Sequence, residues 1–136
     1  MAAIIERPTD PGSRVEGNRK SKPSIKMVSC LIRREKLDLV TAALNKLNLV
    51  GGMTVTDVGV WPGERDPELY RGPRYVMPFV PKVLVELAIE SGDVIEVEKL
   101  VTELARTGDV GDGKIFILDV INAMRIRTGE GGVSAL

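Results

Sequence analysis

The fold is decided by residues 93–121, which read DVIEVEKLVTELARTGDVGDGKIFILDVI. The first half repeats apolar side chains at helical i, i+3 and i+4 spacing, and the second half is a glycine-rich turn followed by an apolar run of strand length. We expect Asp93 to cap the helix, with Glu96 at the capping-box position and Gly108 at the C′ position. The helical stripe consists of Val94, Val97, Leu100, Val101 and Leu104.

The preceding part of the chain has the same alternation of elements. Residues 25–32 and 53–60 have strand patterns, and residues 35–47 between them carry an apolar helical stripe. Two further strands, over residues 82–89 and 115–121, flank the second helix. The order strand–helix–strand, strand–helix–strand predicts an α+β fold, a ferredoxin-like βαββαβ sandwich. Right-handed crossovers place both helices on one face of its four-stranded sheet.

The last strand is apolar on both faces. Ile115, Ile117 and Ile121 would lie on one face, and Phe116, Leu118 and Val120 on the other. A sheet with helices on one side only is expected to alternate apolar and polar residues. Something else must therefore cover the second face, and the pattern itself predicts an oligomer.

Composition bounds the chain to one domain and argues against several functional classes. Its 136 residues include 19 basic and 19 acidic side chains, so no net field attracts nucleic acid. There is no histidine, and the single cysteine, Cys30, sits in a strand pattern and is expected to be a buried thiol. No nucleophile paired with a base and no zinc site can be found. We therefore expect a protein that is not an enzyme and holds no metal.

The apolar runs and the N-terminal residues indicate where the protein is located and where its domain begins. No apolar run approaches the length of a membrane span, and the first residues lack the order of a secretion signal, so we expect a cytoplasmic protein with no membrane insertion. Residues 1–25 contain prolines, glycines and mixed charge without periodicity. We expect them to form a disordered leader that precedes one domain over residues 26–136.

The turn between the second helix and the last strand resembles a polyphosphate cradle. Three glycines lie within residues 108–113, and Lys114 follows them. Glycines allow close approach of backbone amides to an anion, and Arg125 and Arg127 add guanidinium groups on one side of an extended segment. The loop matches neither standard phosphate fingerprint, and the alternatives are a plain turn and a solvated arginine face.

Five ordered segments resemble the PII signal-transduction family. The resemblance runs from about Met27 to Leu136, and the segments that carry it are residues 52–56 (GMTVT), 68–72 (ELYRG), 79–82 (FVPK), 107–120 (TGDVGDGKIFILDV) and 125–130 (RIRTGE). The resemblance implies a compact homotrimer whose open sheet faces turn inward. It also implies that ADP and ATP bind in the clefts between subunits.

The resemblance also implies roles for individual residues. Residues 107–114 match the family's nucleotide loop, in which Gly111, Asp112, Gly113 and Lys114 would hold the phosphates. Arg125 and Arg127, in the C-terminal segment 122–136, would reach the phosphates from the neighbouring subunit. Thr54 and Glu86 match positions near the adenine and ribose.

Residues 61–78 between the second and third strands match the family's T-loop, which docks onto target proteins. The family's glutamine that completes a Mg²⁺ shell with 2-oxoglutarate has no counterpart, since the chain contains no glutamine, although Lys82 matches the lysine that pairs with the keto acid. We therefore expect weak or absent 2-oxoglutarate binding. Tyr75 matches the family's uridylylated tyrosine in an altered setting that begins at Tyr70, and a target-contact role is the alternative. Trp61 is either a packing residue at the loop base or a partner anchor.

The sequence therefore predicts a non-enzymatic regulator that binds ADP or ATP and signals to a membrane transporter or metabolic enzyme. Its altered T-loop base resembles that of divergent PII proteins linked to inorganic carbon and carboxysomes, with bicarbonate as a candidate effector. The alternative is an atypical nitrogen regulator of ammonium transport or glutamine synthesis. Slow ATP hydrolysis at Lys114 and a plain trimeric scaffold are further alternatives.

Overall fold

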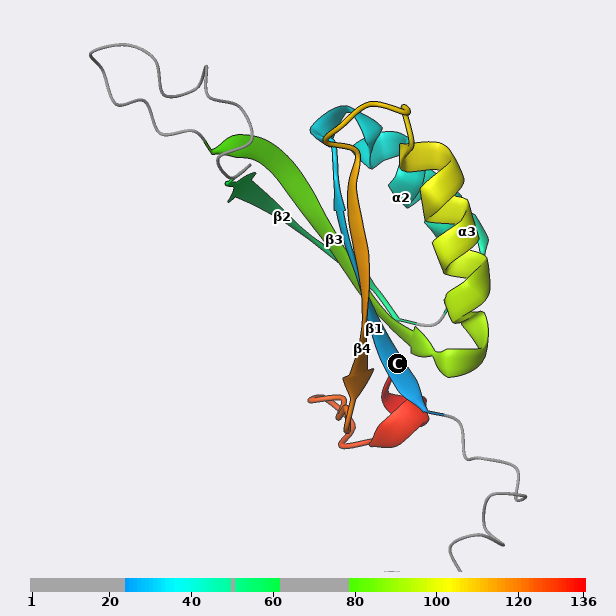
Figure 1. Ribbon diagram of the computed structural model, residues 1–136. Coiled ribbons are helices and arrows are strands. Elements are labelled where there is room, and N and C mark those ends of the chain that lie inside the picture. The colour runs from blue at the N-terminus through cyan, green and yellow to red at the C-terminus, as the bar shows by residue number, and fades with distance from the viewer. Residues whose placement is uncertain (1–23, 50, 62–78) are drawn as a thin grey trace, which may run out of the picture.

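The computed structural model describes residues 24–49, 51–61 and 79–136. Four strands, β1 (Ile25–Ile32), β2 (Met53–Val60), β3 (Val80–Glu90) and β4 (Gly113–Val120), form one antiparallel sheet in the order β2-β3-β1-β4. Two helices, α2 (Leu37–Lys46) and α3 (Val94–Ala105), lie side by side on one face of this sheet (Figure 1). Short 3-10 turns are η2 (Arg34–Lys36), η4 (Ser91–Asp93) and η5 (Gly132–Ala135). The predicted α+β, ferredoxin-like architecture is confirmed.

The core lies between the helices and the two central strands. Alternate residues of β1 and β3 point to the helix face, where branched aliphatic side chains from both helices meet them. The large side chains that are almost completely buried are Ile32, Ile89, Val28, Val40, Val83, Val85, Val97 and Val101, together with Cys30. The expectation that Cys30 is a buried thiol is confirmed, and burial raises the pKa of this thiol to about 11.

The strand predictions for residues 25–32 and 53–60 agree with β1 and β2, while β3 is longer than predicted and β4 begins and ends earlier. Asp93 occupies the N-cap position of α3 as expected, but its side chain makes no capping hydrogen bond, and the 3-10 turn η4 leads into the helix. Gly108 is not at the C′ position. The helix ends at Ala105, where Arg106 is already extended, and Gly108 takes its φ of +95° inside the following loop.

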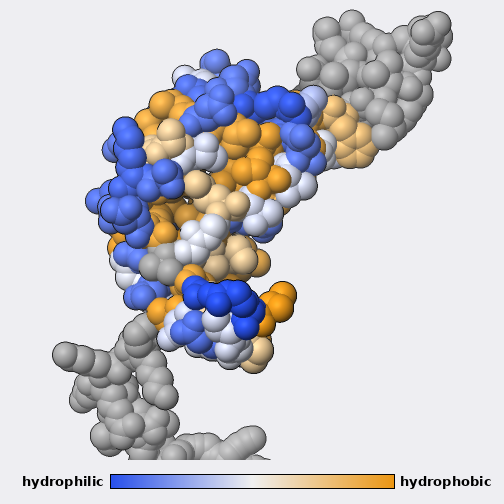
Figure 2. Space-filling model, turned by 180° about the vertical axis from the view of Figure 1, so that it is seen from behind, coloured by the Kyte–Doolittle hydropathy of each residue, from blue (hydrophilic) through white to orange (hydrophobic). Residues whose placement is uncertain are grey.

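The sheet face opposite the helices carries exposed apolar side chains. On β4, Phe116 and Leu118 are each about half exposed at 50% and 49%, as the two-faced apolar pattern predicted. Ile121 follows the end of β4 and is fully exposed. Seen from behind, apolar side chains form a band of surface between polar ones (Figure 2). This face of the single chain is incompletely covered.

The described residues contain neither a membrane-spanning helix nor a cluster of metal-ligating side chains. Among residues 24–49, 51–61 and 79–136, no helix is long and apolar enough to cross a membrane. In the same ranges, no three side chains of the metal-ligating types His, Cys, Asp or Glu gather at one point.

Candidate functional site

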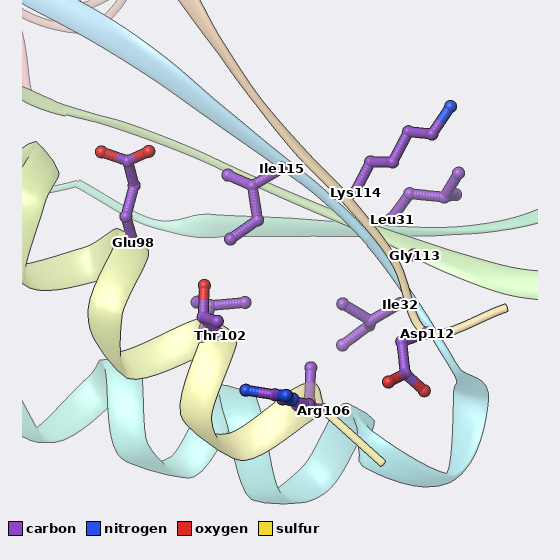
Figure 3. Close-up of a pocket in the computed structure, with 11 residues that line it drawn as sticks. Leu31, Ile32, Glu98, Thr102, Arg106, Asp112, Gly113, Lys114 and Ile115 are labelled. Atoms are coloured by element: carbon purple, nitrogen blue, oxygen red, sulfur yellow. The ribbon is translucent and has the colours of Figure 1, made fainter. Parts of the chain in front are cut away.

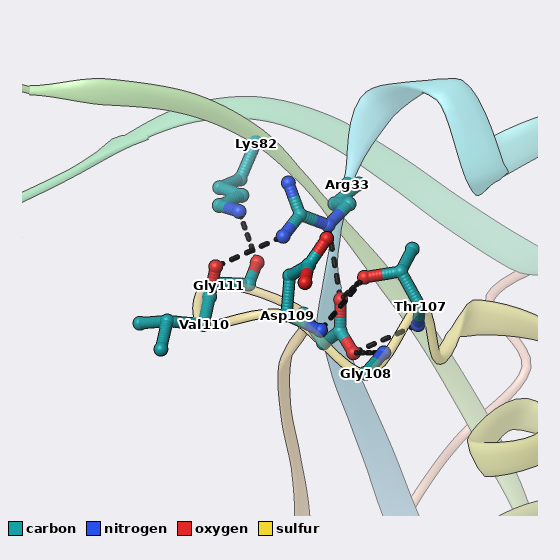
Figure 4. A network of polar contacts seen from close by, with 8 residues as sticks. Arg33, Lys82, Thr107, Gly108, Asp109, Val110 and Gly111 are labelled. Atoms are coloured by element: carbon teal, nitrogen blue, oxygen red, sulfur yellow. Dashed lines mark hydrogen bonds and ion pairs between the residues drawn. The ribbon is translucent and has the colours of Figure 1, made fainter.

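The glycine-rich loop between α3 and β4 is organised around the carboxylate of Asp112. One carboxylate oxygen accepts hydrogen bonds from the amides of Thr107 and Gly108, both at 2.8 Å, and the other accepts the Thr107 hydroxyl. The Thr107 hydroxyl oxygen in turn accepts the amide of Asp109 at 3.1 Å. The loop therefore closes on its own acidic side chain (Figure 4).

Two cations from the sheet hold the same loop from outside. Arg33, directly after β1, donates from Nε to the Asp112 carboxylate at 3.0 Å and from Nη2 to the Val110 carbonyl oxygen at 2.9 Å. The buried Lys82 of β3 donates to the carbonyl oxygen of Gly111. Figure 4 shows both cationic side chains directed at the loop. Arg33 is a site residue that the sequence reasoning missed, since its only signal was a charge at the end of an apolar strand.

These contacts shift two pKa values. The hydrogen bonds from Thr107, followed by those from Gly108 and Arg33, hold the pKa of Asp112 well below its ordinary value. Burial, and then the charge of Arg33, lowers the pKa of Lys82, while Glu35 and Asp112 oppose this shift. The Asp112 carboxylate is therefore charged at neutral pH and is engaged within the protein.

Gly113, the first residue of β4, shows why the loop needs glycine. Its φ is +113°, and a Cβ built there would lie 1.8 Å from the carbonyl oxygen of Leu31 on the neighbouring strand. No side chain fits between these two backbones. Gly111 also has a positive φ, +101°, and its missing side chain leaves room for the Arg33 and Lys82 side chains.

A cavity of about 300 Å³ lies beside this loop, where the end of α3 faces the start of β4. Glu98 and Thr102 approach it from α3, and Arg106 from the residue directly after this helix (Figure 3). Ile32 and Ile115 point from the sheet toward the helix, whereas the exposed Lys114 extends toward the opposite side of the sheet. The cavity and the lysine thus adjoin the same loop on different faces.

Thr54 and Glu86 form a cross-strand pair of β2 and β3 on the face away from the helices. Glu86 accepts a long hydrogen bond of 3.4 Å from the Ser29 hydroxyl. Because β2 and β4 are the two edge strands, Thr54 and Lys114 are separated by three strand spacings, about 14 Å across the sheet. Within one chain, the Thr54–Glu86 pair therefore lies apart from the glycine-rich loop.

Arg125 and Arg127 lie beyond the far end of β4, in the C-terminal segment drawn in orange to red in Figure 1. Arg125 donates to the carbonyl oxygen of Leu136 at 2.7 Å and contacts Glu130 at 3.4 Å. Since β4 has eight residues, about 23 Å of strand separates these arginines from the loop. One chain does not bring the predicted phosphate ligands together.

The predicted partner residues are only partly within the described chain. Trp61 makes an edge-to-face contact with Phe79, with ring centroids 5.6 Å apart. Both aromatic side chains are still nearly half exposed. Tyr70, Tyr75 and most of segment 61–78 lie outside the described residues, as does nearly all of the expected leader.

Comparison with known families gives one description for almost the whole described chain. Residues 25–130 match the sequence profile of the family described as "Nitrogen regulatory protein P-II". Nitrogen regulatory protein P-II 1 of Methanothermobacter thermautotrophicus is 46% identical over 83% of this chain and 98% of its own length. The nitrogen regulatory protein GlnK of Escherichia coli is 41% identical over 82% of this chain and its whole length.

A solved structure is also similar. The crystal structure of Arabidopsis thaliana PII bound to citrate aligns with a TM-score of 0.67 and 34% sequence identity, covering 83% of this chain and 92% of the plant chain. The chain therefore resembles these proteins both in sequence and in three-dimensional structure.

Proposed function

Because the chain belongs to the nitrogen regulatory protein P-II family, we propose that it is a non-enzymatic regulator that binds ADP or ATP and signals through residues 61–78. Members of this family are signal-transduction regulators. The nucleotide would be held by the loop that contains Gly111, Gly113 and Lys114, and its phosphates would provide the charge that the loop recognises.

The geometry of the glycine loop is the observation that carries this proposal. Asp112, Arg33 and Lys82 hold the loop in one shape, while Gly111 and Lys114 remain exposed. A loop fixed before binding loses little conformational freedom when an anion arrives. An exposed lysine beside exposed backbone amides is a suitable arrangement for a polyphosphate.

The remaining predicted ligands require a second copy of the chain. Arg125 and Arg127 are at the far end of β4, and Thr54 is at the opposite sheet edge. We propose a homotrimer in which the exposed face of β4, with Phe116 and Leu118, is buried against a neighbour. Each cleft would then combine the loop of one subunit with the arginines of the next.

The signal would pass to a membrane transporter or a metabolic enzyme that contacts residues 61–78 in the cytoplasm. Control of nitrogen metabolism is supported by the names of the curated relatives. Inorganic-carbon control with bicarbonate is a second candidate, because the chain has no glutamine to complete a Mg²⁺–2-oxoglutarate site. Lys82, the remaining candidate for the keto acid, is buried and already contacts Gly111.

Calorimetric titration tests both the proposed nucleotide binding and the identity of the effector. The purified protein is titrated with ADP and ATP, each alone, with Mg²⁺ and 2-oxoglutarate, and with bicarbonate. Nucleotide binding is expected in every arm. Absence of binding to both nucleotides would overturn the proposed function.

The effector arms separate the two candidates. A gain in ATP affinity with 2-oxoglutarate identifies a nitrogen regulator with a functional keto-acid site. A change in nucleotide affinity with bicarbonate, and none with 2-oxoglutarate, identifies carbon control. A response to neither leaves nucleotide-dependent nitrogen control as the supported candidate.

A further inference from the structure

We propose that Arg33 is a positioning residue of the nucleotide site, which turns the backbone amide of Gly111 toward the bound phosphate without contacting the ligand itself. This inference rests on the proposed function. It also assigns the side chain of Asp112 to the inner structure of the loop rather than to the ligand.

The first step is the orientation of one peptide plane. Residues 109–112 form a tight turn, and the third of them, Gly111, has a φ of +101°, as in a type II turn. Arg33 Nη2 donates to the Val110 carbonyl oxygen at 2.9 Å. A trans peptide bond is planar and its N–H points opposite to its C=O, so the Gly111 amide must point away from Arg33. Arg33 thereby selects one of the two orientations of the central peptide.

A second cation fixes the next carbonyl group. Lys82 donates to the Gly111 oxygen, so both carbonyls that flank the Gly111 α-carbon are held by cationic side chains from the sheet. A Cβ at Gly111 would lie 3.4 Å from Arg33 Nη2 and 3.5 Å from Lys82 Nζ, which places both cations on one side of this residue. Gly111 itself is exposed to solvent.

Three amides at the start of the loop are already engaged. Thr107 and Gly108 donate to Asp112, and Asp109 donates to the Thr107 hydroxyl. By contrast, within residues 24–49, 51–61 and 79–136 the amides of Val110, Gly111 and Asp112 have no protein acceptor. Of these three, the Gly111 amide is the one whose direction is set by the Arg33 contact to the Val110 carbonyl oxygen. The Asp112 carboxylate fills the inside of the loop as a built-in anion, and Gly111 offers its amide to an external one.

Amide hydrogen exchange, followed residue by residue by NMR, tests the orientation directly in the unmodified protein. We expect the Gly111 amide to exchange rapidly in the free protein and to become protected with saturating ATP. The amides of Thr107 and Gly108 should be protected in both states, because Asp112 accepts them throughout. If ATP binds and the Gly111 amide remains unprotected, the inference is wrong.

Arg33→Gln tests the residue, with Arg34→Gln as the matched control. Arg34 is the adjacent arginine, but it pairs with Asp57 on β2 and is mostly exposed. Loss of a charged hydrogen bond predicts a fall in ATP affinity of about tenfold or more for Arg33→Gln, and less than about twofold for Arg34→Gln. Arg33→Lys should retain only part of the ATP affinity, because a lysine ammonium group cannot donate to Val110 and Asp112 together as the guanidinium group does.

A comparison of ligands separates positioning from general damage. Displacement of a fluorescent ATP analogue by ATP and by AMP gives both affinities for each variant. We expect Arg33→Gln to lower the affinity for ATP more than that for AMP, whereas a collapsed cleft would lower both equally. ATP binding that is unchanged in Arg33→Gln overturns this inference alone, and wild-type protein that binds no ATP overturns the proposed function.

Discussion

Gly113 is the residue at which the backbone leaves no choice of side chain. Its φ is +113°, and a Cβ built there would lie 1.8 Å from the carbonyl oxygen of Leu31. Because the clashing oxygen belongs to the backbone, no change of side-chain rotamer can relieve the overlap. We expect Gly113→Ala to lower the free energy of unfolding by about 3 kcal/mol or more, measured by chemical denaturation. Gly92→Ala is the control, because nothing lies within 4 Å of a Cβ there. Equal stability of the two variants would contradict the observed approach of β4 to β1.

Asp112 is the residue whose charge the loop requires. Its pKa is lowered in the folded state, so its stabilising contribution is complete above the unfolded-state pKa of about 4 and is lost as the pH falls below it. We expect Asp112→Asn to be less stable than wild type at pH 7, with the difference shrinking as the pH is lowered from about 4 to 2. Thermal unfolding across this range measures the difference, and a constant gap would refute the role of the carboxylate charge.

At the level of elements, local patterns predicted the strands better than the helix ends. The spans of β1 and β2 followed from alternation and from the glycines that precede β2. The start of α3 directly after Asp93 was also predicted, but the expected capping hydrogen bond is absent, because a side chain at the N-cap position need not make one. Here the backbone enters through the turn η4, and Asp93 makes no capping bond. Ends of this kind depend on how the chain leaves the preceding strand, which residue type alone does not encode.

The junction of β2 and β3 with segment 61–78 makes its own prediction. Trp61 follows β2, Phe79 precedes β3, and their rings meet at 5.6 Å. We expect Phe79→Ala to shift the emission of Trp61, the only tryptophan, to longer wavelength and to cost about 1 kcal/mol of stability. Leu39→Ala, at a half-exposed position of α2, should leave the emission unchanged. An unchanged spectrum in Phe79→Ala would mean that the ring contact does not shield the indole.

At the scale of the whole molecule, the sequence indicates candidate site residues but not where the fold places them. The glycine loop is contiguous, so its spacing was readable. Arg33 is 79 residues from Asp112 in sequence and carries no periodic signal, so only the pairing of β1 with β4 brings the two together. The same sheet separates Lys114 from Arg125 by the length of β4. If these residues serve one ligand, as proposed, they must come from different subunits of an assembly.

The assembly can be tested through one side chain of the exposed sheet face. Leu118 on β4 and Leu39 on α2 are equally exposed, at 49%, but lie on opposite sides of the molecule. A trimer repeats each substitution three times, and an aspartate buried at each interface is strongly unfavourable. We expect the wild type and Leu39→Asp to sediment as trimers, and Leu118→Asp to sediment as a monomer that has also lost ATP binding, because Arg125 then has no neighbouring loop to reach. A trimeric Leu118→Asp protein, or a monomeric wild type at micromolar concentration, would show that the exposed face of β4 does not hold the subunits together.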